Sequence, residues 1–156
     1  MNKTAKNLTV QVNKSYLLET NSSIKLKPVT KNDALFLYDL LKNRDPIANI
    51  SHRKMPSYDE HVNFILSNPY TIWYIIEYEG EKTGSIYLSK QDEIGISLVD
   101  NSLYDKIGKS IIKLLFKNNP RTRYFAKTSP QNKKLQNFFV NNGFTDHEYT
   151  YEIESN

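Results

Sequence analysis

Apolar and polar positions alternate in several short stretches of the chain, the pattern of half-buried β-strands. Two of these stretches, 71–79 and 83–89, are joined by Gly80-Glu81-Lys82, which predicts a β-hairpin. The expected strands cover residues 24–29, 71–79, 83–89, 93–99, 123–128 and 147–153.

Apolar residues recur at helical spacing between these strands. Thr30 precedes the first such stretch as its N-cap. Ser57, with Glu60 three residues later, forms a capping box at the start of the second. A third helix is expected from Asp105, and Asn142-Gly143 ends a fourth. The expected helices cover about 31–42, 58–67, 105–118 and 132–141.

The order of these elements predicts an α/β (α+β) fold with a mixed, mostly antiparallel central sheet. The strand at 93–99 should lie parallel to the strand at 123–128, because a helix connects them in a right-handed crossover. Helices are expected on both faces. We expect one domain over residues 23–156, with residues 1–22 as an N-terminal extension or an extra strand around Leu8–Val12.

Composition narrows the functional classes. The chain has 156 residues, 38% of them hydrophobic, and no cysteine, which excludes disulfides and thiolate metal sites. No apolar run is long enough to span a membrane, so a cytoplasmic protein without membrane contact is expected. The net charge is +4, but the lysines are spread along the chain, so a nucleic-acid partner is not favoured. His52, His61 and His147 are too scattered for a zinc site.

The stretch from Glu93 to Asn119 carries the first chemical signal. It has the pattern of a strand, a loop and a helix, and we expect Gly108 in the loop at the start of that helix. The free backbone N–H groups and the positive dipole end of a helix N-terminus favour a bound phosphate. Many such units bind nothing, so an ordinary crossover is the alternative.

Three features of the chain resemble the GNAT acetyltransferase superfamily. The stretch Asp105-Lys106-Ile107-Gly108-Lys109-Ser110 stands where that family has Arg/Gln-x-x-Gly-x-Gly/Ala. Asn132 is followed eleven residues later by Gly143-Phe144, and the hairpin from Trp73 to Leu88 carries Gly84. The resemblance covers about Ile24 to Ile153 and is closest to single-domain bacterial and phage enzymes.

The resemblance implies an acetyl-CoA-dependent N-acetyltransferase that moves an acetyl group to a primary amine by direct attack. Acetyl-CoA is expected between the two parallel strands, with the Leu98 and Val99 amides on its pantetheine arm and thioester. The expected cofactor-binding residues are Leu98, Val99, Asp105, Lys106, Ile107, Gly108, Lys109, Ser110, Asn132 and Phe139.

The same resemblance places a glutamate on this strand beside the amine, and Glu93 is the expected general base. His52 and His61 are alternatives with a suitable pKa range. The acceptor, a small molecule or an exposed amine, is expected at His52, Arg53, Trp73 and Tyr149. The protein is expected to be a monomer or a homodimer.

Two departures from the family pattern leave a second interpretation open. Asp105 would repel a pyrophosphate, and Phe139 replaces a tyrosine that protonates the leaving thiolate in many members. Tyr149 is a possible substitute, or the thiolate leaves unprotonated. The alternative is a catalytically degenerate GNAT-fold binding module. A nucleic-acid-binding protein is a third hypothesis.

Overall fold

The computed structural model describes residues 23–48 and 54–155. Its centre is a five-stranded sheet in which the strands follow the order β1-β2-β3-β4-β5. Neighbouring strands are antiparallel except β4 and β5, which are parallel, so the predicted fold class is confirmed. The strands are β1 (Ile24–Pro28), β2 (Ile72–Tyr78), β3 (Glu81–Leu88), β4 (Glu93–Leu98) and β5 (Phe125–Ala126).

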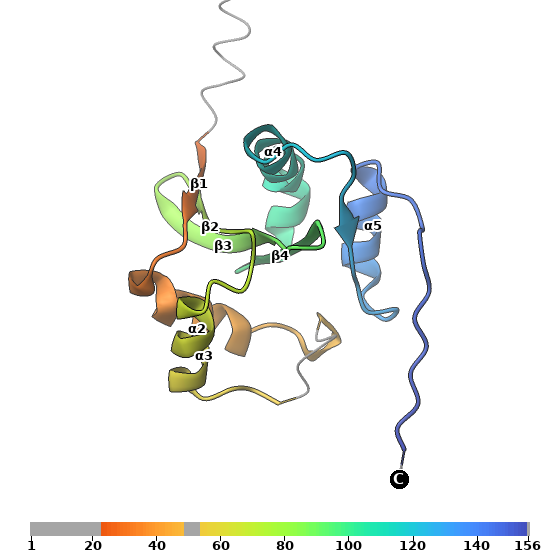
Figure 1. Cartoon of the computed structure of the whole chain (residues 1–156). Coiled ribbons are helices and arrows are strands. Elements are labelled where there is room, and N and C mark those ends of the chain that lie inside the picture. The colour runs from red at the N-terminus through yellow and green to blue at the C-terminus, as the bar shows by residue number, and fades with distance from the viewer. Residues whose placement is uncertain (1–22, 49–53, 156) are drawn as a thin grey trace, which may run out of the picture.

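Helices cover both faces of this sheet, as Figure 1 shows. One face carries α2 (Ala34–Lys42) and α3 (Tyr58–Leu66), packed on a small cluster around Ile75. The other face carries α4 (Ser102–Asn118) and α5 (Lys133–Asn141) over the main core, in which Ile111 and Leu115 are completely buried. Two 3-10 turns, η1 (Lys31–Asp33) and η2 (Pro46–Ala48), flank α2.

The predicted capping box at Ser57 and the predicted helix end at Gly143 are confirmed. The Ser57 hydroxyl accepts a hydrogen bond from the Glu60 N–H at 3.2 Å, and the Glu60 carboxylate accepts one from the Ser57 N–H at 2.7 Å. At the end of α5, Gly143 has a φ of 90°, and the Phe144 N–H donates to the Phe139 carbonyl at 3.1 Å. This is a glycine-terminated helix end of the Schellman type.

Three predicted boundaries were wrong. The hairpin turn is shorter than predicted and consists of Glu79 and Gly80, both with positive φ, because a two-residue turn of this kind matches the twist of the strands. Helix α4 begins at Ser102 rather than at Asp105. Strand β5 has two residues instead of the predicted 123–128.

The predicted last strand, 147–153, does not form in the described chain. Residues 145–155 are extended and belong to no helix or strand, with Tyr149, Tyr151 and Ile153 between 77% and 94% exposed. The alternating pattern is real, but a strand needs a neighbouring strand for its backbone hydrogen bonds. The sheet ends at β5, and no residue of this segment pairs with it.

Gly108 has a packing role that the sequence did not reveal. It is buried inside α4, where a Cβ atom would lie 2.3 Å from the Phe138 Cε2 atom on α5. Phe138 is itself only 6% exposed, so its ring has no open space to move into. The missing side chain therefore lets α4 and α5 approach closely.

We expect Gly108→Ala to lower the free energy of unfolding by about 1–2 kcal/mol, because overpacking costs about 1–3 kcal/mol and the helix preference of alanine returns part of it. Urea unfolding would measure the change. Lys109→Ala, at the neighbouring exposed position, is the control and should change stability by less than about 0.5 kcal/mol. An unchanged midpoint for Gly108→Ala would contradict the close helix contact.

Candidate functional site

Strands β4 and β5 stay together for only two residues before they separate. Glu93 pairs with Phe125 and Ile94 with Ala126, and the pairing ends there although β4 continues to Leu98. Figure 1 shows β5 set apart from β4 on the side of α5. The edge of β4 beyond Ile94 therefore has no neighbouring strand within the described sheet.

The ladder between β3 and β4 defines which backbone groups face this open edge. The Ser89 N–H donates to the Glu93 carbonyl at 2.8 Å, and the Val99 N–H donates to the Thr83 carbonyl at 2.9 Å. In an antiparallel ladder such bonded residues alternate with residues whose N–H and C=O point the other way. The backbone groups of Ile96 and Leu98 thus point toward the open side.

This geometry corrects one of the two predicted cofactor contacts on β4. The Val99 N–H points toward β3 and is already bonded, so it cannot reach a ligand between β4 and β5. The Leu98 N–H has the orientation that was predicted for it.

Tyr104, on the first turn of α4, lies against the open edge. Its hydroxyl donates to the Ile96 carbonyl at 3.3 Å, and its ring contacts Phe138 edge-on at 5.3 Å between centroids. Burial raises the pKa of Tyr104, and the Leu98 backbone and the charge of Arg44 act in the opposite direction. Any extended ligand on this edge would have to replace or use the Tyr104 hydroxyl.

The predicted loop at Asp105–Ser110 is helical, because α4 begins earlier than its apolar pattern suggested. From Asp105 onward the N–H groups bond inside the helix, so the amides of Lys106 to Ser110 cannot hold a diphosphate. Ile107 and Gly108 are buried in the core. The Lys106 ammonium lies 5.2 Å from the centre of the Tyr78 ring.

The true N-terminus of α4 is capped by oxygens of the preceding turn. The Asp100 carboxylate accepts from the Ser102 N–H at 2.8 Å, and the Asp100 carbonyl accepts from the Leu103 N–H at 3.1 Å. The hydrogen bond from the Ser102 backbone lowers the pKa of Asp100, so this group is a carboxylate at neutral pH. Asp105 is 82% exposed at its side chain and pairs with Lys134 at 3.4 Å.

The two predicted cofactor residues on α5 have structural roles here. The Asn132 side-chain oxygen accepts from the Leu135 N–H at 3.1 Å and so caps α5. Phe139 is 6% exposed and packs on Phe138 and Phe144 in the main core.

Glu93 lies where the paired part of β4 begins. Its carboxylate is 2.6 Å from the Lys127 ammonium, just beyond β5. The hydrogen bond from Glu93 raises the pKa of Lys127, and the charges of Glu93 and Glu148 add to this effect. The pair is partly solvent-exposed, so its net contribution to stability is small.

The face of the sheet that carries Glu93 continues into a row of aromatic side chains. Trp73, Tyr87 and Gly95 are directly opposite one another on β2, β3 and β4. A Cβ atom at Gly95 would lie 2.1 Å from the Tyr87 Cζ atom and 2.4 Å from its hydroxyl oxygen, so the Tyr87 side chain packs directly on Gly95 of β4. Tyr70 stacks on Tyr87 with 3.8 Å between the ring centres and 2° between the planes.

Arg44 brings a positive charge to the same face. It follows the C-terminus of α2, and its N–H donates to the Leu41 carbonyl at 3.3 Å. Burial lowers the pKa of Arg44, and its charge acts on the hydroxyls of Tyr70, Tyr87 and Tyr104. The charge of Arg44 is therefore within electrostatic range of these three hydroxyls.

Sequence reasoning missed Arg44, Tyr70, Tyr87, Tyr104 and Lys127 as candidates. They come from five separate segments of the chain, and no local spacing connects them. Tyr104 offered one usable signal, because it lies two residues after the turn formers Asp100, Asn101 and Ser102.

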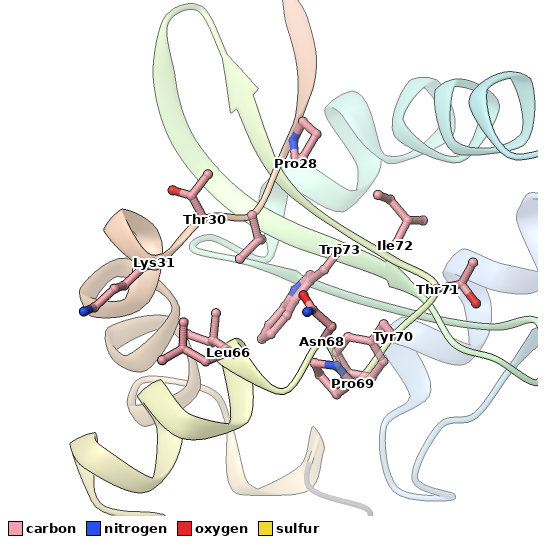
Figure 2. A pocket seen from close by; sticks show the side chains of 12 residues that line it. Pro28, Thr30, Lys31, Leu66, Asn68, Pro69, Tyr70, Thr71, Ile72 and Trp73 are labelled. Carbon is pink, nitrogen blue, oxygen red and sulfur yellow. The ribbon is translucent and has the colours of Figure 1, made fainter.

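Trp73 and Tyr70 both line a pocket of about 340 Å³. Figure 2 shows Trp73 beside Tyr70, Asn68 and Leu66 in this pocket. The buried Trp73 Nε1 has no hydrogen-bond partner among the described residues. Tyr70 and Trp73 thus connect this pocket to the aromatic row over β4.

Tyr149, another predicted acceptor residue, does not join this row. His52 and Arg53 lie outside the described residues. Tyr149 is 77% exposed in the C-terminal segment, and its hydroxyl donates to the Asp146 carboxylate at 3.2 Å. His61 is 5% exposed beside Tyr38, and burial lowers its pKa, as expected for a packed histidine.

Two classes of site find no support in the described part of the chain. Its histidines and carboxylates form no group of three that could hold a metal ion. None of its helices is both long and apolar enough to cross a membrane.

Comparisons with known proteins add evidence on the fold. No family model matches the chain, and no curated protein matches it in sequence. Among solved structures, a domain from Methanocaldococcus jannaschii superposes with a TM-score of 0.71 at 22% identity, covering 85% of this chain and 94% of that one.

Named acetyltransferase structures superpose nearly as well. Spermidine N-acetyltransferase SpeG from Vibrio cholerae has a TM-score of 0.63 at 15% identity, covering 82% of this chain and 83% of that one. AAC(6')-Ib, in complex with paromomycin and acetyl-CoA, has a TM-score of 0.63 at 22% identity, covering 80% and 84%. At these identities the likeness concerns the fold. The chain has the fold of the GNAT acetyltransferases.

Proposed function

We propose that the protein is an N-acetyltransferase that moves an acetyl group from acetyl-CoA to a primary amine on a small molecule or an exposed chain end. The observation that carries this proposal is the separation of β4 and β5 after two paired residues, which leaves the Ile96 and Leu98 backbone groups at an open edge. A parallel pair that stayed together to its ends would offer no place for an extended cofactor.

The chain's residues fit one part of coenzyme A better than the other. The open edge of β4 suits the amide-bearing pantetheine arm, once the Tyr104 hydroxyl gives up the Ile96 carbonyl. The diphosphate would lie at the start of α4, between Val99 and Tyr104, where it meets the Asp100 carboxylate. We therefore expect binding that is weakened by this charge.

Acetyl-CoA supplies an acetyl group activated as a thioester. Glu93 is the proposed general base, because its carboxylate lies at the paired end of β4, next to the open edge. It would accept the ammonium proton of the acceptor through water, since Leu98 is five residues further along the strand. The neutral amine is then free to attack. The Leu98 N–H is the proposed donor to the acetyl oxygen, a contribution of about 10²–10³ in rate for such donors.

A specific observation also favours the second candidate, a binding module without catalysis. The N–H groups at the start of α4 are occupied by oxygens of Asp100 and Asn101, so the helix end is closed without a ligand. In such a module, acetyl-CoA would bind without turnover or would not bind.

The decisive measurement is the melting temperature with acetyl-CoA and no acceptor. Binding at 100 times the Kd contributes about 2.7 kcal/mol, and each kcal/mol raises the Tm of a chain of this size by about 2–4 °C. A rise of several degrees is expected, whereas ADP at the same concentration should give much less. Equal shifts for the two ligands would indicate anion binding alone, and no shift would overturn the proposal.

A further inference from the structure

The C-terminal segment, residues 145–155, presents large apolar side chains to solvent. Tyr149, Tyr151 and Ile153 are 77%, 91% and 94% exposed, and they stand at every second position of an extended chain. Side chains at this spacing share one face of the chain. A single exposed apolar residue is ordinary, whereas three on one face indicate a contact surface. This surface is independent of the proposed function.

The outer edge of β5 offers backbone groups to a further strand. The Phe125 N–H donates to the Asp92 carbonyl at 2.9 Å and therefore points toward β4. Because backbone directions alternate along a strand, the N–H and C=O groups of Tyr124 and Ala126 point the other way. The described sheet ends at β5, so this edge pairs with no further strand of that sheet. Such an edge can accept an extended segment from another chain.

A hollow of about 310 Å³ lies beside this edge. Its aromatic lining consists of Phe116, Tyr124, Phe125 and Phe144, and the first two rings are stacked at 4.0 Å between centres. The volume is at the small end of the range for ligand pockets and suits a large side chain. An aromatic side chain that enters would meet other rings, and such pairs are favourable.

The chain cannot fill this hollow with its own exposed tyrosines. His147 already lines the hollow, with its ring 5.1 Å from that of Phe125, and the segment then continues past α5 and away from the sheet (Figure 1). A return would need a tight turn directly after His147. Residues 148–153 contain no glycine, proline, asparagine, aspartate or serine, the residue types that favour such turns. The same segment of a second copy meets no such constraint.

We propose that the C-terminal segment of each molecule binds along the β5 edge of a second copy, and that this reciprocal exchange forms a closed dimer. Tyr149 and Tyr151 cover the aromatic hollow, and the backbone adds a strand to the sheet. Each tyrosine buries about 150–250 Å². With both copies and the covered surface counted, the contact reaches about 1,200–2,000 Å², the size of a specific interface. A reciprocal contact closes at two copies, so larger assemblies do not form.

The first measurement is the mass of the full chain in solution. Light scattering during size-exclusion chromatography should give about 36 kDa at high micromolar concentration, twice the 18.2 kDa of one chain. A dilution series then yields the dissociation constant. A mass of one chain throughout would overturn the proposal, and so would assemblies that keep growing with concentration.

Tyr151→Lys should raise the dissociation constant of the dimer by at least about tenfold, because it removes an aromatic contact and buries a charge. Thr150→Lys is the matched control, since it adds the same charge on the opposite face of the same segment and should leave the constant within about threefold. Both positions are exposed, so neither change should affect folding. Equal constants for the two variants would contradict the proposed contact face.

The acceptor side is tested by Thr145→Glu. Thr145 is an exposed residue that lines the hollow, and a carboxylate there faces the negative faces of aromatic rings. This variant should also weaken the dimer at least about tenfold. An equal mixture of Thr145→Glu and Tyr151→Lys should dimerise more tightly than either variant alone, because one of the two exchanged contacts is intact in the mixed pair.

The mixture separates strand exchange from other ways of forming a dimer. If the C-terminal segments paired with each other, or if another surface held the dimer, Thr145→Glu would have no effect and mixing would restore nothing. Either result would overturn the proposal. Neither depends on whether acetyl-CoA binds, so the failure of this inference and the failure of the transferase proposal are distinguishable.

Discussion

Glu93→Gln should lower kcat by about 10²–10⁴, the range that a positioned general base contributes. Glutamine has nearly the same shape but cannot accept the proton of the acceptor ammonium. The Glu93–Lys127 pair is partly exposed, so its loss should cost less than about 1 kcal/mol of stability. The measurement is the steady-state rate of thiol release with a saturating amine, beside the Tm with and without acetyl-CoA.

The Tm with and without acetyl-CoA distinguishes a loss of catalysis from a loss of cofactor binding. If Glu93 is the base, the variant keeps the rise in Tm with acetyl-CoA and loses turnover. A binding module would show no consequence of the change at all. Lys90→Gln, an exposed substitution just before β4, serves as the control. A variant that retains turnover within about threefold would exclude Glu93 as the base, because a factor this small is below the range of general-base catalysis.

Gly84→Ala should be the most damaging single-methyl addition in the chain. A Cβ atom at Gly84 on β3 would fall on the backbone carbonyl oxygen of Ser97 and near the side chain of Leu98. A backbone atom in a sheet cannot rotate away, so β3 and β4 must separate. We expect a loss of about 3 kcal/mol in the free energy of unfolding, the upper end of the range for overpacking.

This loss is a large fraction of the 5–15 kcal/mol that is typical for a domain. Urea unfolding followed by circular dichroism would measure it. Glu81→Ala, at the exposed start of the same strand, should stay within about 0.5 kcal/mol of the unchanged protein. A Gly84→Ala variant as stable as that control would mean that the strands are farther apart than the structure shows.

The helix-end features that were predicted correctly depend on contacts within a few residues. The capping box of Ser57 and Glu60 and the helix end at Gly143 are complete within their own segments. The start of α4 was missed because its first turn, at Ser102, Leu103 and Tyr104, precedes the apolar repeat that begins at Ile107. Because these three residues are already helical, the predicted diphosphate-binding loop at Asp105–Ser110 does not form.

Other features depend on distant segments, so the sequence alone did not determine them. The pattern from Arg123 to Thr128 is that of a strand, yet its pairing ends at Ala126, where β5 separates from β4. Gly84 was singled out through a family resemblance, whereas its physical role is the close approach of Ser97. Arg44 acts electrostatically on Tyr70, Tyr87 and Tyr104, which all lie far from it in the sequence.

The aromatic row gives the protein an intrinsic fluorescence signal that reports on this face of the sheet. Trp73 is the only tryptophan in the chain, and its ring is 5.1 Å from Tyr70, which stacks on Tyr87 over β4. Light absorbed by these tyrosines can pass to Trp73, so its emission should respond when a ligand moves the stack. Ligand binding to the face of the sheet that carries the aromatic row can therefore be followed by intrinsic fluorescence, without a label and independently of turnover.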